Sequence, residues 1–166
     1  MNNLEGDLWV NGNITGKSMS VPTSAVTDNS VAPFANVSAS KLQQQIEETA
    51  VLADFATSAA AKRVQIHRVY GATATIQIFG VEASTANIGA ATVVLDLLRN
   101  GTSVLSAQIT LDSTTAAYAL KQPVGFVSTS LVQGDVLEAQ IVSATAGGGT
   151  LAKGVAAHLV LRAQAQ

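Results

Sequence analysis

Residues 92–111 carry the pattern that most restricts what this chain can fold into. They read TVVLDLLRNGTSVLSAQITL, two apolar runs that flank Asn100 and Gly101. Both residues tolerate a positive φ, which the tight turn of a β-hairpin requires. Alternation places one set of side chains on a common face: Val93, Leu95, Leu97, Leu105, Ala107, Ile109 and Leu111. The stretch therefore predicts two paired strands with one buried face.

Further runs between residues 62 and 162 also read as short strands with turns between them. They are RVQIHRV, TATIQIFGV, AAYALK, PVGFVS, DVLEAQIVS and GVAAHLVLR. The side chains expected to share a face are Val64 with Ile66, Ile76 with Ile78, and Val155 with Ala157, Leu159 and Leu161. About eight such strands are typical of antiparallel Greek-key folds. We expect residues 62–166 to form a β-sandwich or jelly-roll-like domain, with SATAGGGTLAKG as a flexible loop.

Residues 38–61, SASKLQQQIEETAVLADFATSAAA, predict one helix. Ser40 and Gln43 fit a capping box, and most interior residues are acceptable helix formers. Three- and four-residue steps give an apolar seam: Leu42, Ile46, Thr49, Ala53, Ala56 and Ala60. Two interpretations fit this seam. The helix packs on its own domain, or three identical helices pack together as the stalk of a trimer.

Residues 1–37 show no helical periodicity and contain too few large apolar side chains to bury a core of their own. Yet apolar residues occur at a density that a solvated tail rarely has: Trp9, Val21, Val26, Val31 and Phe34. We therefore expect this region to be an extended arm that a protein partner orders.

Gly16, Lys17 and Ser18 invite comparison with a phosphate-binding loop, which needs a glycine, four residues, then Gly-Lys-Ser/Thr before a helix. Asn11 stands where the first glycine should be, and Gly12 is one residue too close. The following residues, SMSVP, end in a proline and favour extended geometry. The sequence therefore predicts no nucleotide site.

Composition narrows the possible partners. The chain has no cysteine, a net charge of −2 and no basic cluster, which argues against thiol chemistry and against a nucleic-acid surface. No run of eighteen apolar residues and no secretory leader occurs, so no membrane partner is expected. Charged residues make up 12% of the chain, about half of the ~25% usual for soluble domains. Either this is simply a β protein rich in small residues, or copies of itself or a larger assembly cover its surface.

The residues that carry chemistry are few. His67 and His158 alternate with apolar neighbours on expected strands, where a surface or interface role is more common than metal ligation. The carboxylates of the strand region are isolated in sequence: Glu82, Asp96, Asp112, Asp135 and Glu138. No hydrolase, zinc or calcium motif occurs. We expect no catalytic residue, no cofactor and no metal.

Residues 6–16, GDLWVNGNITG, are similar to a short motif near the N-termini of bacteriophage fibre and virion surface proteins. The expected helix at 41–55 and the strand domain after it resemble the stalk and β-sandwich head of such proteins. The stretches TVVLDLLRNGTSVLSAQITLDS and LVQGDVLEAQIVSATAGGGTLAKGVAAHLVL resemble a sandwich domain common in phage-encoded proteins. The resemblance implies a homotrimeric capsid decoration (cement) protein, made in the host cytoplasm and bound to the major capsid protein on the outer surface of the virion.

By this resemblance the arm contacts the capsid through Leu4, Leu8, Trp9, Val10, Ile14, Val21 and Phe34. The trimer interface would comprise Leu42, Ile46, Thr49, Ala53 and Ala56. An alternative is a fibre or receptor-binding tip that contacts a host-surface glycan, although few aromatic residues besides Tyr70, Tyr118 and the phenylalanines are available to stack on sugars. A third hypothesis is an enzyme of unrecognised type.

Overall fold

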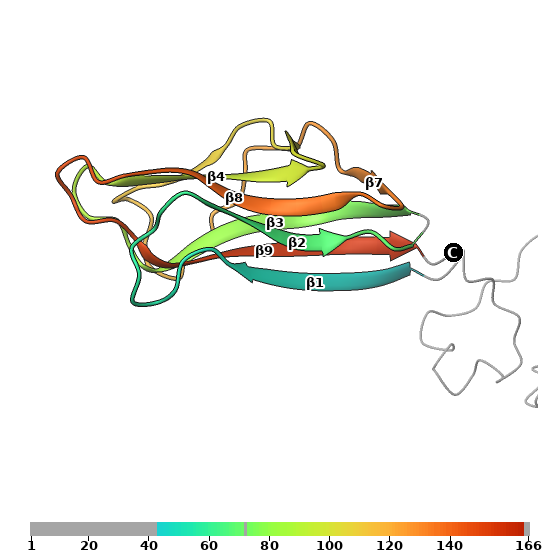
Figure 1. Ribbon diagram of the computed structural model, residues 1–166, viewed down its shortest axis with the longest axis horizontal. Coiled ribbons are helices and arrows are strands. Elements are labelled where there is room, and N and C mark those ends of the chain that lie inside the picture. The colour runs from blue at the N-terminus through green and yellow to red at the C-terminus, as the bar shows by residue number, and fades with distance from the viewer. Residues whose placement is uncertain (1–42, 72, 165–166) are drawn as a thin grey trace, which may run out of the picture. The chain divides into compact units, whose positions relative to one another are not determined.

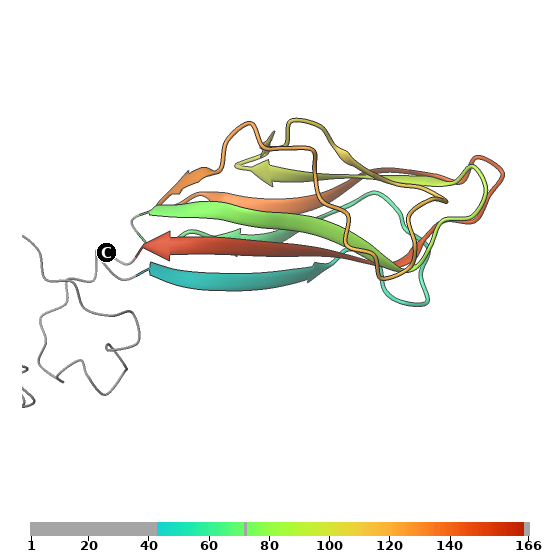
Figure 2. The same cartoon turned by 180° about the vertical axis from the view of Figure 1, so that it is seen from behind.

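The computed structural model describes residues 43–71 and 73–164, which form two antiparallel sheets packed face to face (Figures 1 and 2). Sheet A contains, in order, β1 (Gln43–Val51), β9 (Lys153–Gln164), β3 (Thr73–Thr85) and β7 (Ser130–Val132). Sheet B contains β2 (Lys62–Arg68), β8 (Val136–Thr145) and β4 (Thr92–Arg99), with β5 (Thr102–Ser103) and β6 (Ile109–Leu111) both paired to β4. The predicted antiparallel β-sandwich is confirmed.

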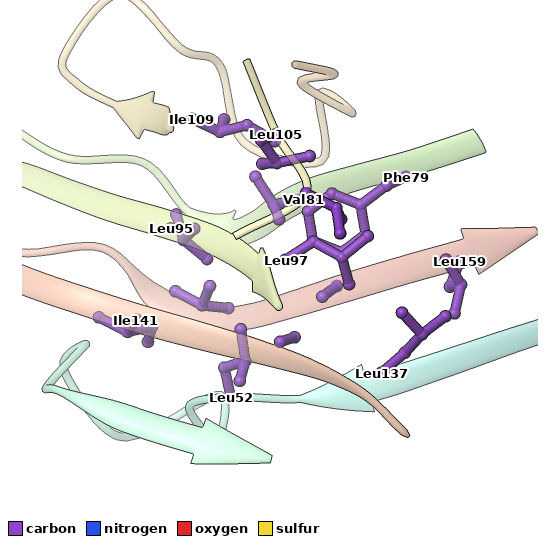
Figure 3. Close-up of a cluster of buried hydrophobic side chains, with 14 of the residues drawn as sticks. Leu52, Phe79, Val81, Leu95, Leu97, Leu105, Ile109, Leu137, Ile141 and Leu159 are labelled. Carbon is purple, nitrogen blue, oxygen red and sulfur yellow. The ribbon is translucent and has the colours of Figure 1, made fainter. Parts of the chain in front are cut away.

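The core lies between the sheets and draws on both of them (Figure 3). In β9 the four residues predicted to share a face are all fully buried: Val155, Ala157, Leu159 and Leu161. Phe79 and Val81 of β3 lie beside them in the same sheet, and Leu95 and Leu97 of β4 and Leu137 of β8 face them from sheet B. Each large side chain buried in this way contributes about 1.5–3 kcal/mol.

The predicted turn at Asn100 and Gly101 forms, with φ of 51° and 85°. The second run then departs from the prediction, because β5 is only two residues long and the chain returns to β4 at β6. Between them Val104 still donates a hydrogen bond to Leu97 of β4, and the segment also pairs with residues 125–127, where Leu105 bridges Phe126. Ala107 was expected on the buried face and is exposed instead.

The helix predicted for residues 38–61 is wrong for residues 43–61, and residues 38–42 lie outside the described residues. Gln43–Val51 is the edge strand β1, and turns follow it up to β2. β1 pairs with β9 along its whole length, from Gln43 opposite Gln164 to Val51 opposite Ala156. This tertiary pairing outweighs the modest helix propensity of the segment.

Two β-bulges invert predicted faces. In β3 the register shifts between Ile76 and Ile78, so that Ile76 is buried while Ile78 is 40% exposed on the outer face. In β2 Val64 and Ile66 both pack against the core as predicted, but the shift between Gln65 and His67 also turns His67 toward the inside, opposite Leu137 of β8. A bulge inserts one extra residue and so reverses the alternation beyond it.

Residues 112–129 contain neither of the two strands predicted there, AAYALK and PVGFVS. The chain instead makes separate backbone contacts along the free side of β3 and near β5. Tyr118 N–H donates to Ala83, and Lys121 exchanges two hydrogen bonds with Val81. Tyr118 itself has a φ of 59°, a conformation that interrupts a regular strand.

The chain enters and leaves the sandwich at the same end. Gln43, the first described residue, pairs with Gln164, the last. The loops at residues 86–91 and 146–152 lie at the opposite end, where Ile88 and Thr150 exchange two backbone hydrogen bonds (Figure 1). A Cβ atom at Gly149 would lie 1.9 Å from the Ile88 carbonyl oxygen, so this close approach requires glycine. The glycine-rich segment, predicted as a flexible loop, is thus hydrogen-bonded to the loop at residues 86–91.

Candidate functional site

The predicted capsid-contact residues lie outside the described residues. They are Leu4, Leu8, Trp9, Val10, Ile14, Val21 and Phe34. Leu42, the first member of the predicted trimer seam, lies outside as well. The roles assigned to these side chains therefore stay predictions.

The other four residues of the predicted trimer interface do not share a face. Ile46 is half-buried opposite Leu161 on the inner side of β1, and Ala53 is buried in the core. Thr49 points outward, and Ala56 is exposed in the turn after β1. The prediction that one helical stripe joins them is wrong, because the segment is a strand followed by a turn. These residues therefore do not support a trimer built on a helical seam.

Two carboxylates that looked isolated in sequence are buried and hydrogen-bonded. Asp96 accepts hydrogen bonds from the side chains of Ser103 at 2.7 Å and Gln108 at 3.1 Å. Asp135 accepts from the Asn100 side chain at 2.6 Å and from a backbone N–H at 2.9 Å. These contacts hold the β4–β5 and β7–β8 turns in place, which is a structural role.

Asp112 closes an exposed turn in the same way. Its Oδ1 accepts the hydroxyl of Thr114 at 2.6 Å and the N–H of Thr114 at 2.9 Å. The hydrogen bonds from Thr114 are the main cause that lowers the pKa of Asp112, and the charge of Lys121 lowers it further.

Each histidine links strands through a carboxylate or a hydroxyl. His67 Nδ1 lies 3.3 Å from Glu48 of β1, joining the neighbouring edges of the two sheets. His158 is on the outer face of sheet A, where its Nδ1 is 3.1 Å from the Thr49 hydroxyl and its Nε2 is 3.2 Å from Glu82. Nε2 is shielded from solvent and has no hydrogen-bond partner among the described residues.

Nowhere among residues 43–71 and 73–164 do three or more histidine, aspartate or glutamate side chains gather as a metal site requires. A membrane-spanning helix is likewise absent from the described residues. The surface that stands out is apolar instead.

The outer side of sheet A exposes large apolar side chains from its strands and from the adjoining loops. We call this set the apolar face: Val51, Phe55, Ile78, Tyr118, Leu120 and Val132. Gly80 lies under part of it, since a Cβ there would be 2.7 Å from the Leu120 side chain. Figure 2 shows β1, β9 and β3, which form the base of this face. Exposed apolar side chains mark an interaction site where they form a large contiguous patch.

The outer side of sheet B is polar. Arg63 and Glu138 form an ion pair across β2 and β8, which raises the pKa of Arg63 mainly through the hydrogen bond to Glu138. Gln65 and Gln140 flank this pair in the strand register. Val142, at a bulge of β8, is the one large apolar side chain on the described strands of sheet B that is exposed.

One end of the apolar face is hollowed into a cleft, which we call the aromatic cleft. Its lining residues are Val51, Ala53, Phe55, Glu82, Ser84, Tyr118, Gly154, Val155 and Ala156. The cleft lies toward the end of β1 at Val51, away from the end where Gln43 begins the strand. No sequence pattern indicated it, because Phe55 and Tyr118 are 63 residues apart and each sits in a turn.

Backbone hydrogen bonds hold both aromatic residues in place. The turn that carries Phe55 is bonded to β9, since Leu52 and Ala53 donate to the Val155 carbonyl and Gly154 donates to the Asp54 carbonyl. Tyr118 is bonded to β3 through Ala83. The two side chains are nevertheless 73% and 67% exposed, so a fixed backbone presents two rings to solvent.

No protein-family model and no curated protein matches this chain, so the likeness to virion proteins is carried by the short motifs of its sequence alone.

Proposed function

We propose that this chain is a non-enzymatic structural protein of a bacteriophage virion, a capsid decoration (cement) protein. In this proposal it binds the major capsid protein on the outer surface of the head, as a homotrimer, and stabilises the shell. The observation that carries the proposal is the apolar face of sheet A. Exposed apolar surface with charged residues such as Glu82 and Arg162 among it suits docking onto protein.

The connection of the chain to the sandwich supports a division between anchor and head. Residues 1–42 join the domain at the end where β1 begins, and the loops at 86–91 and 146–152 lie at the other end. Apolar residues of the arm, Trp9 first among them, would add strands or fill pockets on the shell. Three arms on one trimer would bind almost intramolecularly after the first.

The trimer now rests on the sequence resemblance, since the helical seam is absent from residues 43–61. Light scattering on the purified chain tests it directly. A mass of three times the 16.9 kDa chain is expected at micromolar concentration. A 16.9 kDa particle would remove the trimer from the proposal without touching the docking surface.

Binding to capsids that lack the protein tests attachment. The full chain should sediment with such capsids, and a chain without residues 1–37 should keep its fold and fail to attach. Unchanged attachment of the shortened chain would show that the arm is not the anchor.

The alternative is a fibre or receptor-binding tip that contacts a host-surface glycan. The observation in its favour is that Tyr70 and Tyr118 expose their rings to solvent, because aromatic rings can stack on other flat or apolar groups. Saturable binding of the full chain on a glycan array, together with absence from the head, would favour this alternative.

A further inference from the structure

The aromatic cleft is a preorganised hollow rather than a chance gap between side chains. Gly154 forms part of its floor with a φ of 60°, a left-handed conformation that favours glycine. A Cβ there would lie 2.0 Å from the Ser84 Oγ and 3.2 Å from the ring of Phe55. The floor is therefore kept free of a side chain, and the Phe55 ring lies close to the backbone of β9.

The walls of the cleft are aromatic and its charge is negative. Phe55 and Tyr118 supply two rings, and Glu82 is the one formally charged side chain among the described residues that line it. Asp54 and Lys153 adjoin the lining in sequence with opposite charges, but neither lines the cleft. Cations are attracted both by the faces of aromatic rings and by a carboxylate.

The polar groups of the cleft are too few for a sugar, whose several hydroxyls each need a partner. The Ser84 hydroxyl already donates to the Lys153 carbonyl at 2.9 Å. One Glu82 oxygen lies 3.2 Å from His158. What remains is a largely apolar hollow with one carboxylate, which suits a ligand with a diffuse positive charge.

We propose that the aromatic cleft binds an organic cation, either a quaternary ammonium group or the side chain of a lysine or arginine. The cation lies against Phe55 and Tyr118, and Glu82 supplies the complementary charge. This binding activity does not depend on the proposed place of the protein in a virion.

Choline and its neutral isostere 3,3-dimethyl-1-butanol test the role of charge, because they differ in charge and hardly in shape. Each is titrated into the full chain, and the amide NMR signals of Tyr118, Gly154 and Ala156 are followed. Choline should shift these signals saturably and bind at least about fivefold more tightly than the isostere. Equal affinities, or no saturable shift with any cation, would overturn the proposal.

Matched variants locate the site. Glu82→Gln and Phe55→Ala should each weaken choline binding about fivefold or more, while the affinity for the neutral isostere should change little in Glu82→Gln. Glu47→Gln on the same side of sheet A and Tyr70→Ala, an exposed aromatic outside the cleft, should bind as the parent does. Equal losses in variants and controls would place the binding elsewhere.

Two further probes distinguish the sources of the cation. Nα-acetyl-lysine methylamide and Nα-acetyl-arginine methylamide, whose side chains keep their positive charge, represent a basic side chain of a protein. Choline represents a trimethylammonium headgroup. Binding of either kind of cation supports the proposed site, and the kind that binds more tightly identifies the source of the cation. Binding of methyl glucoside that survives in Glu82→Gln, with no binding of cations, would show a sugar site and contradict the proposal.

Discussion

The two outer faces of the sandwich differ more than its two inner faces do. Inside, sheets A and B contribute matched leucines and valines, such as Leu159 and Leu137. Outside, sheet B carries the Arg63–Glu138 ion pair and glutamines, whereas sheet A and its adjoining turns expose valine, isoleucine and aromatic side chains among charged residues such as Glu47 and Arg162. Folding needs only the inner faces, so the outer faces are free to differ. The apolar one is where we expect a partner.

The largest expected effect comes from removing the edge of sheet A. Deleting residues 1–51 takes away β1 and uncovers β9, including Leu159 and Leu161, and should unfold the domain or lower its melting temperature sharply. Deleting residues 1–37 leaves β1 intact and should barely change it. Thermal unfolding followed by circular dichroism compares the two. Equal stability of both would contradict β1 as part of the sheet.

Matched core substitutions ask whether the inner faces are equivalent. Leu159→Ala in sheet A and Leu137→Ala in sheet B each remove a fully buried side chain and should each lower the free energy of unfolding by about 2–5 kcal/mol. Urea denaturation gives both values. A cost near zero for one of them would show that its sheet does not share the core.

Replacing two glycines that have positive φ tests how tightly the floor of the aromatic cleft is packed. Gly154→Ala adds a clash with Ser84 to an unfavourable φ, and should cost about 1–3 kcal/mol. Gly148→Ala is the matched control, because its φ is 84° and no atom lies within 4 Å of its added Cβ. Chemical denaturation should give the smaller loss for Gly148→Ala. The reverse order would mean that the floor is not tightly packed.

Substitutions on the outer faces separate binding from stability. Ile78→Ser and Val132→Ser on the apolar face should each change stability by less than about 1 kcal/mol, since both side chains are already exposed. They should weaken attachment to capsids that lack the protein. Gln65→Ser on sheet B should leave attachment unchanged. If it weakens attachment as much as Ile78→Ser does, the contrast between the faces has no functional meaning.

The smallest effect is the pH dependence contributed by Asp112. Its pKa is lowered from the ordinary 3.8 by the hydrogen bonds of Thr114, so folding favours the charged form. This stability is fully present above 3.8 and is lost as the pH falls through the lower pKa of the folded state. The melting-temperature difference between the parent and Asp112→Asn should therefore shrink on acidification. A difference that grows toward low pH would have the wrong sign.

The sequence predicted the fold where local pattern and tertiary pairing agree. β9 alternates without interruption, and the Asn100–Gly101 turn needs only the conformations those residues favour. The prediction failed for residues 43–51, because helix propensity and a polar edge strand are compatible with the same glutamine-rich stretch. Only the pairing with β9 decides between a helix and a strand, and this pairing cannot be recognised from the local sequence pattern.

Bulges and turns explain what was missed at the candidate site. A single extra residue near Ile78 reverses the faces of β3, and a period of two cannot show where it falls. Phe55 and Tyr118 meet at one cleft only because their turns bond to neighbouring strands. Glu82 was identified in the sequence as a carboxylate of the strand region, but the residues that line the cleft with it could not be identified.

Electron cryomicroscopy of the virions to which we propose this protein belongs is the most decisive experiment. We expect sandwich-shaped density in groups of three on the outer surface of the head, joined to the major capsid protein on the side where β1 begins. Density confined to the tail or fibre tips, or particles that lack the protein altogether, would contradict it.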